Sequence, residues 1–190
     1  MQKFTKMTKE QQEEVEKNYT PVWEEGSQRV VNYEGWNIFV EPDKVCCLPF
    51  LQEYNSILLR VEPVPSYKLR NPEQSDFLTC MSETMKDNES PEQTLRRGLI
   101  EEFGIKLDNS YKVEFDGELY QFKGGDTKVH ICLIPLMEHD YLDVPILTDG
   151  SKEEKNSKIV KVDLKYLNSL KPSDLTTAFL INKLKLYLKS

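Results

Sequence analysis

Basic residues are in the minority in this 190-residue chain, where 25 Lys and Arg stand against 32 Asp and Glu, a formal net charge of −7. Proteins that bind nucleic-acid backbones need a basic surface to displace counterions, so the overall charge argues against that partner. No apolar run reaches the roughly 18 to 20 residues of a membrane helix, and the first residues lack the apolar core of a secretory signal. We therefore expect a soluble, cytoplasmic protein with no membrane partner.

Cysteine and histidine are also scarce, with four and two residues, and no C-x-x-C motif is present. Cys46 and Cys47 are neighbours on a predicted strand, and Cys80 and Cys132 lie in other apolar runs. This pattern favours free, buried cysteines over a zinc or redox site, which places the chain in a reducing compartment. His130 lies in the apolar run VHICLIP, where a structural role is favoured over a catalytic one.

Hydrophobic periodicity and turn signals divide the chain into short elements. Residues 138–157 are polar and acidic, and we expect a mobile loop there. The order of elements predicts helices on both sides of a mixed sheet. The expected strands are 29–33, 36–41, 45–50, 56–62, 112–122, 128–135 and 159–162, and the expected helices are 8–19, 90–103, 164–170 and 173–188, the last of them capped by Ser173.

The most informative segment is ESPEQTLRRGLIEEFGI, residues 89–105. Ser90 is placed to cap a helix, Pro91 takes the first helical position, and Gln93 completes a capping box. Gly104 supplies the residue that typically ends a helix. The sequence therefore predicts a helix with both ends defined.

One face of this predicted helix carries carboxylates. Positions 98, 101 and 102 lie on the same side, and Glu101 and Glu102 offer the oxygen ligands that Mg²⁺ or Mn²⁺ prefers. The third position is Gly98, and a glycine inside a helix costs about 1 kcal/mol relative to alanine. A glutamate at position 98 is expected to add a third carboxylate to this face.

The segment resembles the Nudix box, G-x5-E-x7-R-E-U-x-E-E-x-G-U, where U is an aliphatic residue. Two positions depart from the pattern: Glu83 stands in place of the opening Gly, and Gly98 stands in place of the Glu that follows the Arg. Met81, Ser82 and Glu83 also replace the usual Pro-Gly-Gly. The matching residues are Glu89, Arg97, Leu99, Glu101, Glu102, Gly104 and Ile105.

The flanking sequence looks like the ADP-ribose and nucleoside-diphosphate-sugar pyrophosphatase branch of this superfamily. Residues 45–68 are similar to the strands before the box, and residues 159–189 to the end of the fold. The resemblance implies an α/β fold, a Nudix-like α/β/α sandwich with a mixed sheet over residues 44–190. Residues 1–43 would form a short N-terminal helix and a β-hairpin extension. In that branch such strands often help to build a homodimer.

The chemistry that the resemblance implies is attack of water on a diphosphate, assisted by Mg²⁺ or Mn²⁺. Glu101 and Glu102 would be metal ligands and catalytic residues, and Glu89 would be an outer metal partner. Arg97 stands four residues before Glu101, at a spacing that favours an orienting ion pair. We therefore expect Arg97 to orient a carboxylate.

A general base can come from a loop outside the box in this branch. Glu153 and Glu154 are the candidates, and Asp149 and Asp126 are further acids with no specific signal. Two functions follow from these observations. The first is a metal-dependent hydrolase of a nucleoside diphosphate linked to another moiety, of the ADP-ribose or nucleotide-sugar type. The alternative is a catalytically impaired Nudix-fold module that binds a nucleotide ligand or a protein partner.

Overall fold

The computed structural model describes residues 20–25, 28–33, 35–64, 76–120, 125–146 and 157–189. The chain divides into two compact units. The smaller unit comprises residues 1–42 and 120–128, and the larger comprises residues 43–119 and 129–190. The helix predicted over residues 8–19 lies outside the described residues.

The smaller unit contains a three-stranded antiparallel sheet in the order β1, β2, β3 (Thr20–Glu25, Gln28–Tyr33 and Trp36–Val40). The predicted hairpin is confirmed, since β2 and β3 pair up to Tyr33 and Trp36, and Gly35 in the turn has a φ of 82°. Strand β1 was not predicted, because Pro21 and two glutamates weaken its strand pattern.

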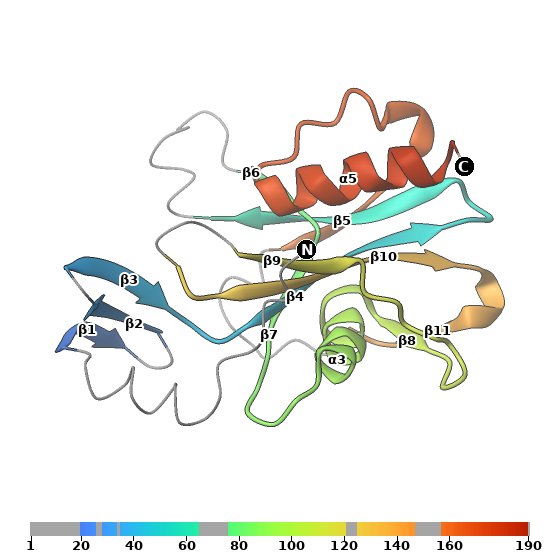
Figure 1. Ribbon diagram of the computed structural model, residues 1–190. Coiled ribbons are helices and arrows are strands. Elements are labelled where there is room, and N and C mark those ends of the chain that lie inside the picture. The colour runs from blue at the N-terminus through green and yellow to red at the C-terminus, as the bar shows by residue number, and fades with distance from the viewer. Residues whose placement is uncertain are drawn as a thin grey trace. The chain divides into compact units, whose positions relative to one another are not determined.

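The larger unit is built on a seven-stranded sheet (Figure 1). Its main path runs β12-β5-β4-β10-β9, with β6 paired to β5 and β7 paired to β4. Because β4 pairs in parallel with β10 but antiparallel with β5 and β7, the sheet is mixed, as predicted. The strands are β4 (Lys44–Leu51), β5 (Ser56–Pro63), β6 (Asp76–Thr79), β7 (Met81–Thr84), β9 (Gly117–Tyr120), β10 (Lys128–Leu136) and β12 (Lys158–Asp163).

Helices cover both faces of this sheet, α3 (Pro91–Phe103) on one side and α5 (Leu175–Tyr187) on the other (Figure 1). Side chains of a strand alternate between the two faces, so each central strand contributes to two apolar cores. The core on the α3 side contains Val45, Cys47, Leu58, Met81, Leu95, Leu99, Phe103, Cys132 and Ile134. The core on the α5 side contains Cys46, Leu48, Ile57, Leu59, Cys80, Ile131, Leu133, Leu180 and Leu184. The predicted three-layer arrangement of helix, sheet and helix is therefore present.

Part of the predicted mobile loop is regular structure. Residues 138–140 form a short 3₁₀ helix and residues 141–143 form β11 (Tyr141–Asp143), which pairs with β8 (Ile105–Leu107). The turn before β11 is held by a hydrogen bond from the backbone N–H of Met137 to Asp140 Oδ2 (2.8 Å). The prediction of a loop here was wrong because a three-residue strand has too little periodicity to recognise; residues 147–156 lie outside the described part.

Three further boundaries differ from those predicted. The strand expected over 112–122 is limited to β9 in the described residues. Asp116 donates its backbone N–H to the carbonyl of Ile131 (2.8 Å), but the N–H of Leu133 is taken by the Asp116 carboxylate rather than by a backbone carbonyl. The helix expected over 164–170 is a 3₁₀ turn at 164–166. The last helix is capped by Asp174, because the hydroxyl of Ser173 accepts a hydrogen bond from the N–H of Leu78 instead.

No helix in the described part of the chain is long and apolar enough to cross a membrane.

Candidate functional site

The box helix α3 has the ends that its sequence predicts. Ser90 Oγ accepts a hydrogen bond from the N–H of Gln93, and the side chain of Gln93 accepts one from the N–H of Ser90. Pro91 occupies the first turn, and Gly104 ends the helix in the left-handed conformation with φ 66°. These caps fix where the helix begins and therefore which of its residues face the sheet.

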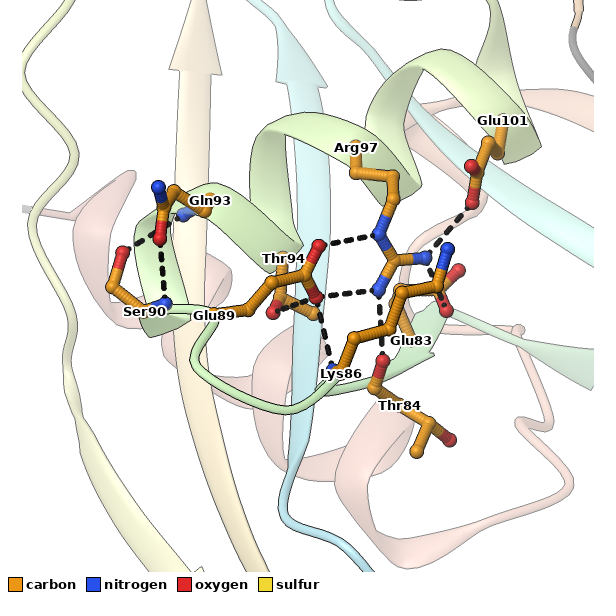
Figure 2. A network of polar contacts seen from close by, with 9 residues as sticks. All are labelled: Glu83, Thr84, Lys86, Glu89, Ser90, Gln93, Thr94, Arg97 and Glu101. Atoms are coloured by element: carbon orange, nitrogen blue, oxygen red, sulfur yellow. Dashed lines mark hydrogen bonds and ion pairs between the residues drawn. The ribbon is translucent and has the colours of Figure 1, made fainter.

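Glu89, just before the helix, is fixed by several donors (Figure 2). Its carboxylate accepts hydrogen bonds from the N–H of Lys86 (3.0 Å) and from Thr94 Oγ1 (2.9 Å), and it pairs with Arg97 through both oxygens. The hydrogen bonds from Arg97 are the main reason that the pKa of Glu89 falls to about 2. Glu89 is therefore ionised and held in one orientation across the neutral range.

Arg97 is the centre of this network. Its Nε and Nη2 atoms donate to Glu89, and its Nη1 atom lies 2.9 Å from Glu101 Oε2 and 2.8 Å from Glu83 Oε1. Nη2 also donates to the carbonyl of Thr84 (2.8 Å). Hydrogen bonding to these carboxylates, Glu89 first, raises the pKa of Arg97. The i,i+4 contact with Glu101 is the one that the spacing suggested, and it suits an orienting residue.

Glu102 faces the sheet and contacts a different arginine from the one that Glu101 contacts. The Glu102 side chain is only 3% exposed, and its Oε2 atom lies 2.6 Å from Nη1 of Arg60 on strand β5. Burial raises the pKa of Glu102 to about 8, although Arg60 acts in the opposite direction. The two adjacent glutamates therefore contact two different arginines, Glu101 with Arg97 and Glu102 with Arg60.

Arg60 was not among the residues predicted from the sequence. Leu58, Arg60 and Glu62 alternate along β5, so they point to the same side of the sheet, where Leu58 joins the α3 core. Arg60 also pairs with Glu62 (3.3 Å) and donates to Ser157 Oγ (2.7 Å). The available signal was an arginine inside an otherwise apolar strand, ILLRV, on the side that faces the helix.

Gly98 is buried against strand β7. A Cβ atom at this position would lie 2.9 Å from Met81 Sδ and 3.0 Å from Glu83 Cβ. The space that a glutamate at position 98 would need is thus already filled, and adding a carboxylate there requires the strand side chains to move.

A magnesium or manganese site needs several oxygen ligands that converge on one point. Among the described residues, no group of three or more His, Cys, Asp or Glu side chains is placed to hold a metal ion. Three of the carboxylates converge on Arg97, those of Glu83, Glu89 and Glu101. The Glu102 carboxyl group contacts Arg60 instead. In this arrangement the described residues do not fit a metal.

The remaining candidates lie elsewhere. Glu153, Glu154 and Asp149 are outside the described residues. Asp126 belongs to the smaller unit, where its backbone N–H donates to the carbonyl of Phe39 (3.0 Å). His130 is nearly buried, with Nδ1 3.3 Å from Glu118.

The cysteine prediction is confirmed, since Cys46, Cys47, Cys80 and Cys132 are free and buried.

Comparison with known proteins supports the fold. No family model and no curated protein matches the sequence. The structure is similar to a crystal structure of an ADP compounds hydrolase, with a TM-score of 0.61 over 90% of this chain and 95% of the other, at 15% sequence identity. At that identity the likeness concerns the fold alone. With the three layers described above, it confirms the predicted fold class, an α/β/α sandwich with a mixed sheet.

Proposed function

We propose that the chain binds a nucleoside diphosphate linked to another moiety, of the ADP-ribose or nucleotide-sugar type, as a Nudix-fold module in which metal-dependent hydrolysis is impaired. The ligand class is supported by the similarity of the fold to an ADP compounds hydrolase and by the resemblance of residues 83–105 to the Nudix box.

The contact between Arg60 and Glu102 is the observation that carries the impairment. A cation that took Glu102 as a ligand would have to displace the Arg60 guanidinium at 2.6 Å, in a place where both side chains are at most 9% exposed. Separating a buried pair leaves an uncompensated charge, which costs several kcal/mol. Together with the missing carboxylate at position 98, this contact disfavours metal binding on the inner side of the helix.

The second candidate is the metal-dependent hydrolase itself, with Mg²⁺ or Mn²⁺ as cofactor. It is favoured by the excess of carboxylates at Arg97, where Glu83, Glu89 and Glu101 surround one guanidinium. In this version Glu101, Glu102 and Glu89 would hold the metal, and Glu153 or Glu154 would supply the base. The negative charge left over after Arg97 is neutralised would attract the cation.

One pair of measurements on the wild-type protein separates the two candidates. Calorimetric titration with ADP-ribose, with and without MgCl₂ or MnCl₂, measures binding, and chromatography after overnight incubation measures release of nucleoside monophosphate. Binding without release supports the module. Metal-dependent release that is lost in Glu102→Gln supports the hydrolase, and absence of binding in every condition contradicts both.

We also propose that residues 29–41, which cover most of strand β2 and all of strand β3, take part in a homodimer. Light scattering coupled to size exclusion should then give twice the 22.2 kDa mass of the chain. A monomer at micromolar concentration would remove this proposal without affecting the ligand.

A further inference from the structure

The two positions at which the box departs from its pattern contact each other. Glu83 lies on strand β7 and Gly98 lies in the middle of helix α3, 15 residues later in the chain. A Cβ atom on residue 98 would be 3.0 Å from Glu83 Cβ and 3.2 Å from Glu83 Cγ. Glu83 therefore occupies the volume that the first atoms of a side chain at position 98 would need.

Strand geometry explains why Glu83 reaches the helix. Successive side chains of β7 point to opposite faces: Met81 joins the core on the α3 side, while Ser82 accepts a hydrogen bond from Cys46 Sγ on the other side. Glu83 follows Met81 by two residues and points to the same side as Met81. It passes over the bare backbone at Gly98 to reach Arg97.

The carboxylate of Glu83 completes the set of partners of Arg97. Glu89 occupies Nε and Nη2, and Nη1 is shared by Glu101 and Glu83 at 2.9 and 2.8 Å (Figure 2). Arginine has five N–H donors in a rigid plane, and here each nitrogen has at least one carboxylate partner. The Arg97 side chain is 16% exposed, so these partners replace most of its water.

We infer that residues 83 and 98 are energetically coupled: strand β7 supplies, through Glu83, the carboxylate that helix α3 lacks at Gly98. We also infer that Glu83 is a positioning residue for Arg97 and, through Arg97, for Glu101. Because Gly98 has no side chain, the Glu83 side chain can approach the helix backbone there and reach Arg97. The inference goes beyond the proposed function and does not depend on which ligand the chain binds.

A double-mutant cycle tests the coupling. Gly98→Ala adds only the Cβ atom, and overpacking is expected to raise the unfolding equilibrium constant about tenfold or more in the wild-type background. In the Glu83→Gly background the Glu83 atoms at 3.0 and 3.2 Å are gone, and the one close atom left is Met81 Sδ at 2.9 Å, near the end of a flexible side chain that can shift. With the higher helix propensity of alanine, the effect of Gly98→Ala on the unfolding equilibrium constant should then fall to less than about threefold. The equilibrium constants come from urea unfolding, and equal effects of Gly98→Ala in both backgrounds would overturn the coupling.

A second comparison tests positioning separately from space filling. Glu83→Gln keeps an oxygen acceptor at the same reach, whereas Glu83→Met fills a similar volume without one. If Glu83 positions Arg97, the Nη protons of Arg97 exchange with water more slowly in the wild type and Glu83→Gln than in Glu83→Met, as measured by ¹⁵N-detected NMR. Equal exchange rates of the Arg97 Nη protons in folded Glu83→Gln and Glu83→Met variants would show that Glu83 only fills space, and would refute the positioning role.

Discussion

The Nη1 atom of Arg60 lies 2.6 Å from the Oε2 atom of Glu102, between strand β5 and helix α3. Both residues are less than 10% exposed, so neither charge is stabilised by bulk water. The pair joins the second helical carboxylate of the box to the sheet. The stability of this part of the unit should therefore depend on both partners being present.

Replacing Arg60 alone tests this dependence. Above the Glu102 pKa of about 8, where the carboxyl is ionised, Arg60→Met should leave a buried charge without its partner and lower the free energy of unfolding by about 3 to 5 kcal/mol. The double variant Arg60→Met/Glu102→Leu should recover most of that loss, because two apolar side chains pack without needing a counter-charge. Urea unfolding of the wild type and these two variants gives the values, and a double variant as unstable as Arg60→Met would contradict the pairing.

The pH dependence of stability should reflect the buried Glu102. Its pKa rises from 4.5 to about 8 on folding, so the folded state holds the proton more tightly than the unfolded state. This group therefore makes the protein less stable as the pH rises from 4.5 to about 8, with no further change above that range.

Glu102→Gln removes that contribution, so its stability relative to the wild type should increase with pH across the same window. Parallel thermal melts at several pH values measure the difference. A difference that stays constant from acidic to mildly alkaline pH would mean that Glu102 titrates normally.

Restoring the Nudix-box residues at positions 83 and 98 should allow the carboxylates of helix α3 to bind a cation. In Glu83→Gly/Gly98→Glu the side chain of Glu83 no longer blocks position 98. The remaining close atom is Met81 Sδ, near the end of a flexible side chain that can shift, so a third carboxylate can join Glu101 and Glu102 on the helix. We expect tighter Mn²⁺ binding than in the wild type by calorimetry, whereas Gly98→Glu alone should be destabilised by its contacts with Met81 and Glu83. Unchanged Mn²⁺ affinity in a folded double variant would contradict this placement.

Gly104 should be intolerant of a side chain for two reasons. Its φ of 66° is unfavourable for other residues, and a Cβ atom would lie 2.5 Å from the carbonyl oxygen of Val144. Gly104→Ala should lower the free energy of unfolding by at least about 1 to 3 kcal/mol. Asn88→Ala is the control, because Asn88 already carries a Cβ at φ 66°. Similar small losses in both variants would show that the contact with Val144 relaxes freely.

Thr177 should anchor helix α5 to the sheet through its hydroxyl. Its Oγ1 atom accepts a hydrogen bond from the N–H of Cys80 (2.8 Å) and donates one to Asp174 Oδ2 (2.6 Å), and the residue is fully buried. Thr177→Val should destabilise the protein by about 1 to 3 kcal/mol, because it leaves the Cys80 N–H unsatisfied.

Thr176→Val is the matched control for that change. It makes the same exchange at the neighbouring, half-buried helical position and should have a much smaller effect. Equal midpoints of urea unfolding for the two variants would show that the Thr177 hydroxyl contributes nothing specific.

Local signals predicted the box helix well, because its caps depend on residues within a few positions of each other. Ser90, Gln93 and Gly104 could be recognised from the sequence for that reason. Turn signals likewise predicted the hairpin, and apolar runs such as VHICLIP predicted the central strands of the sheet.

The partners of the box residues could not be predicted in the same way. Arg60 meets Glu102 across 42 positions of sequence, and Glu83 meets Gly98 only because β7 pairs with β4 next to the helix. Each contact depends on strand order and register, which local periodicity does not define. For the same reason, two departures that looked independent in the sequence prove to be neighbours in the structure.

The parallel pairing of β4 with β10 has a consequence for biosynthesis. Lys44 aligns with Val129, 85 positions later, and none of the strands described between them takes that place beside β4. While the ribosome is still making the intervening segment, one edge of β4 is left with unused amide and carbonyl groups. Such an edge is prone to mispairing with other nascent chains, so the time taken to translate this stretch sets how long the growing polypeptide is exposed to that risk.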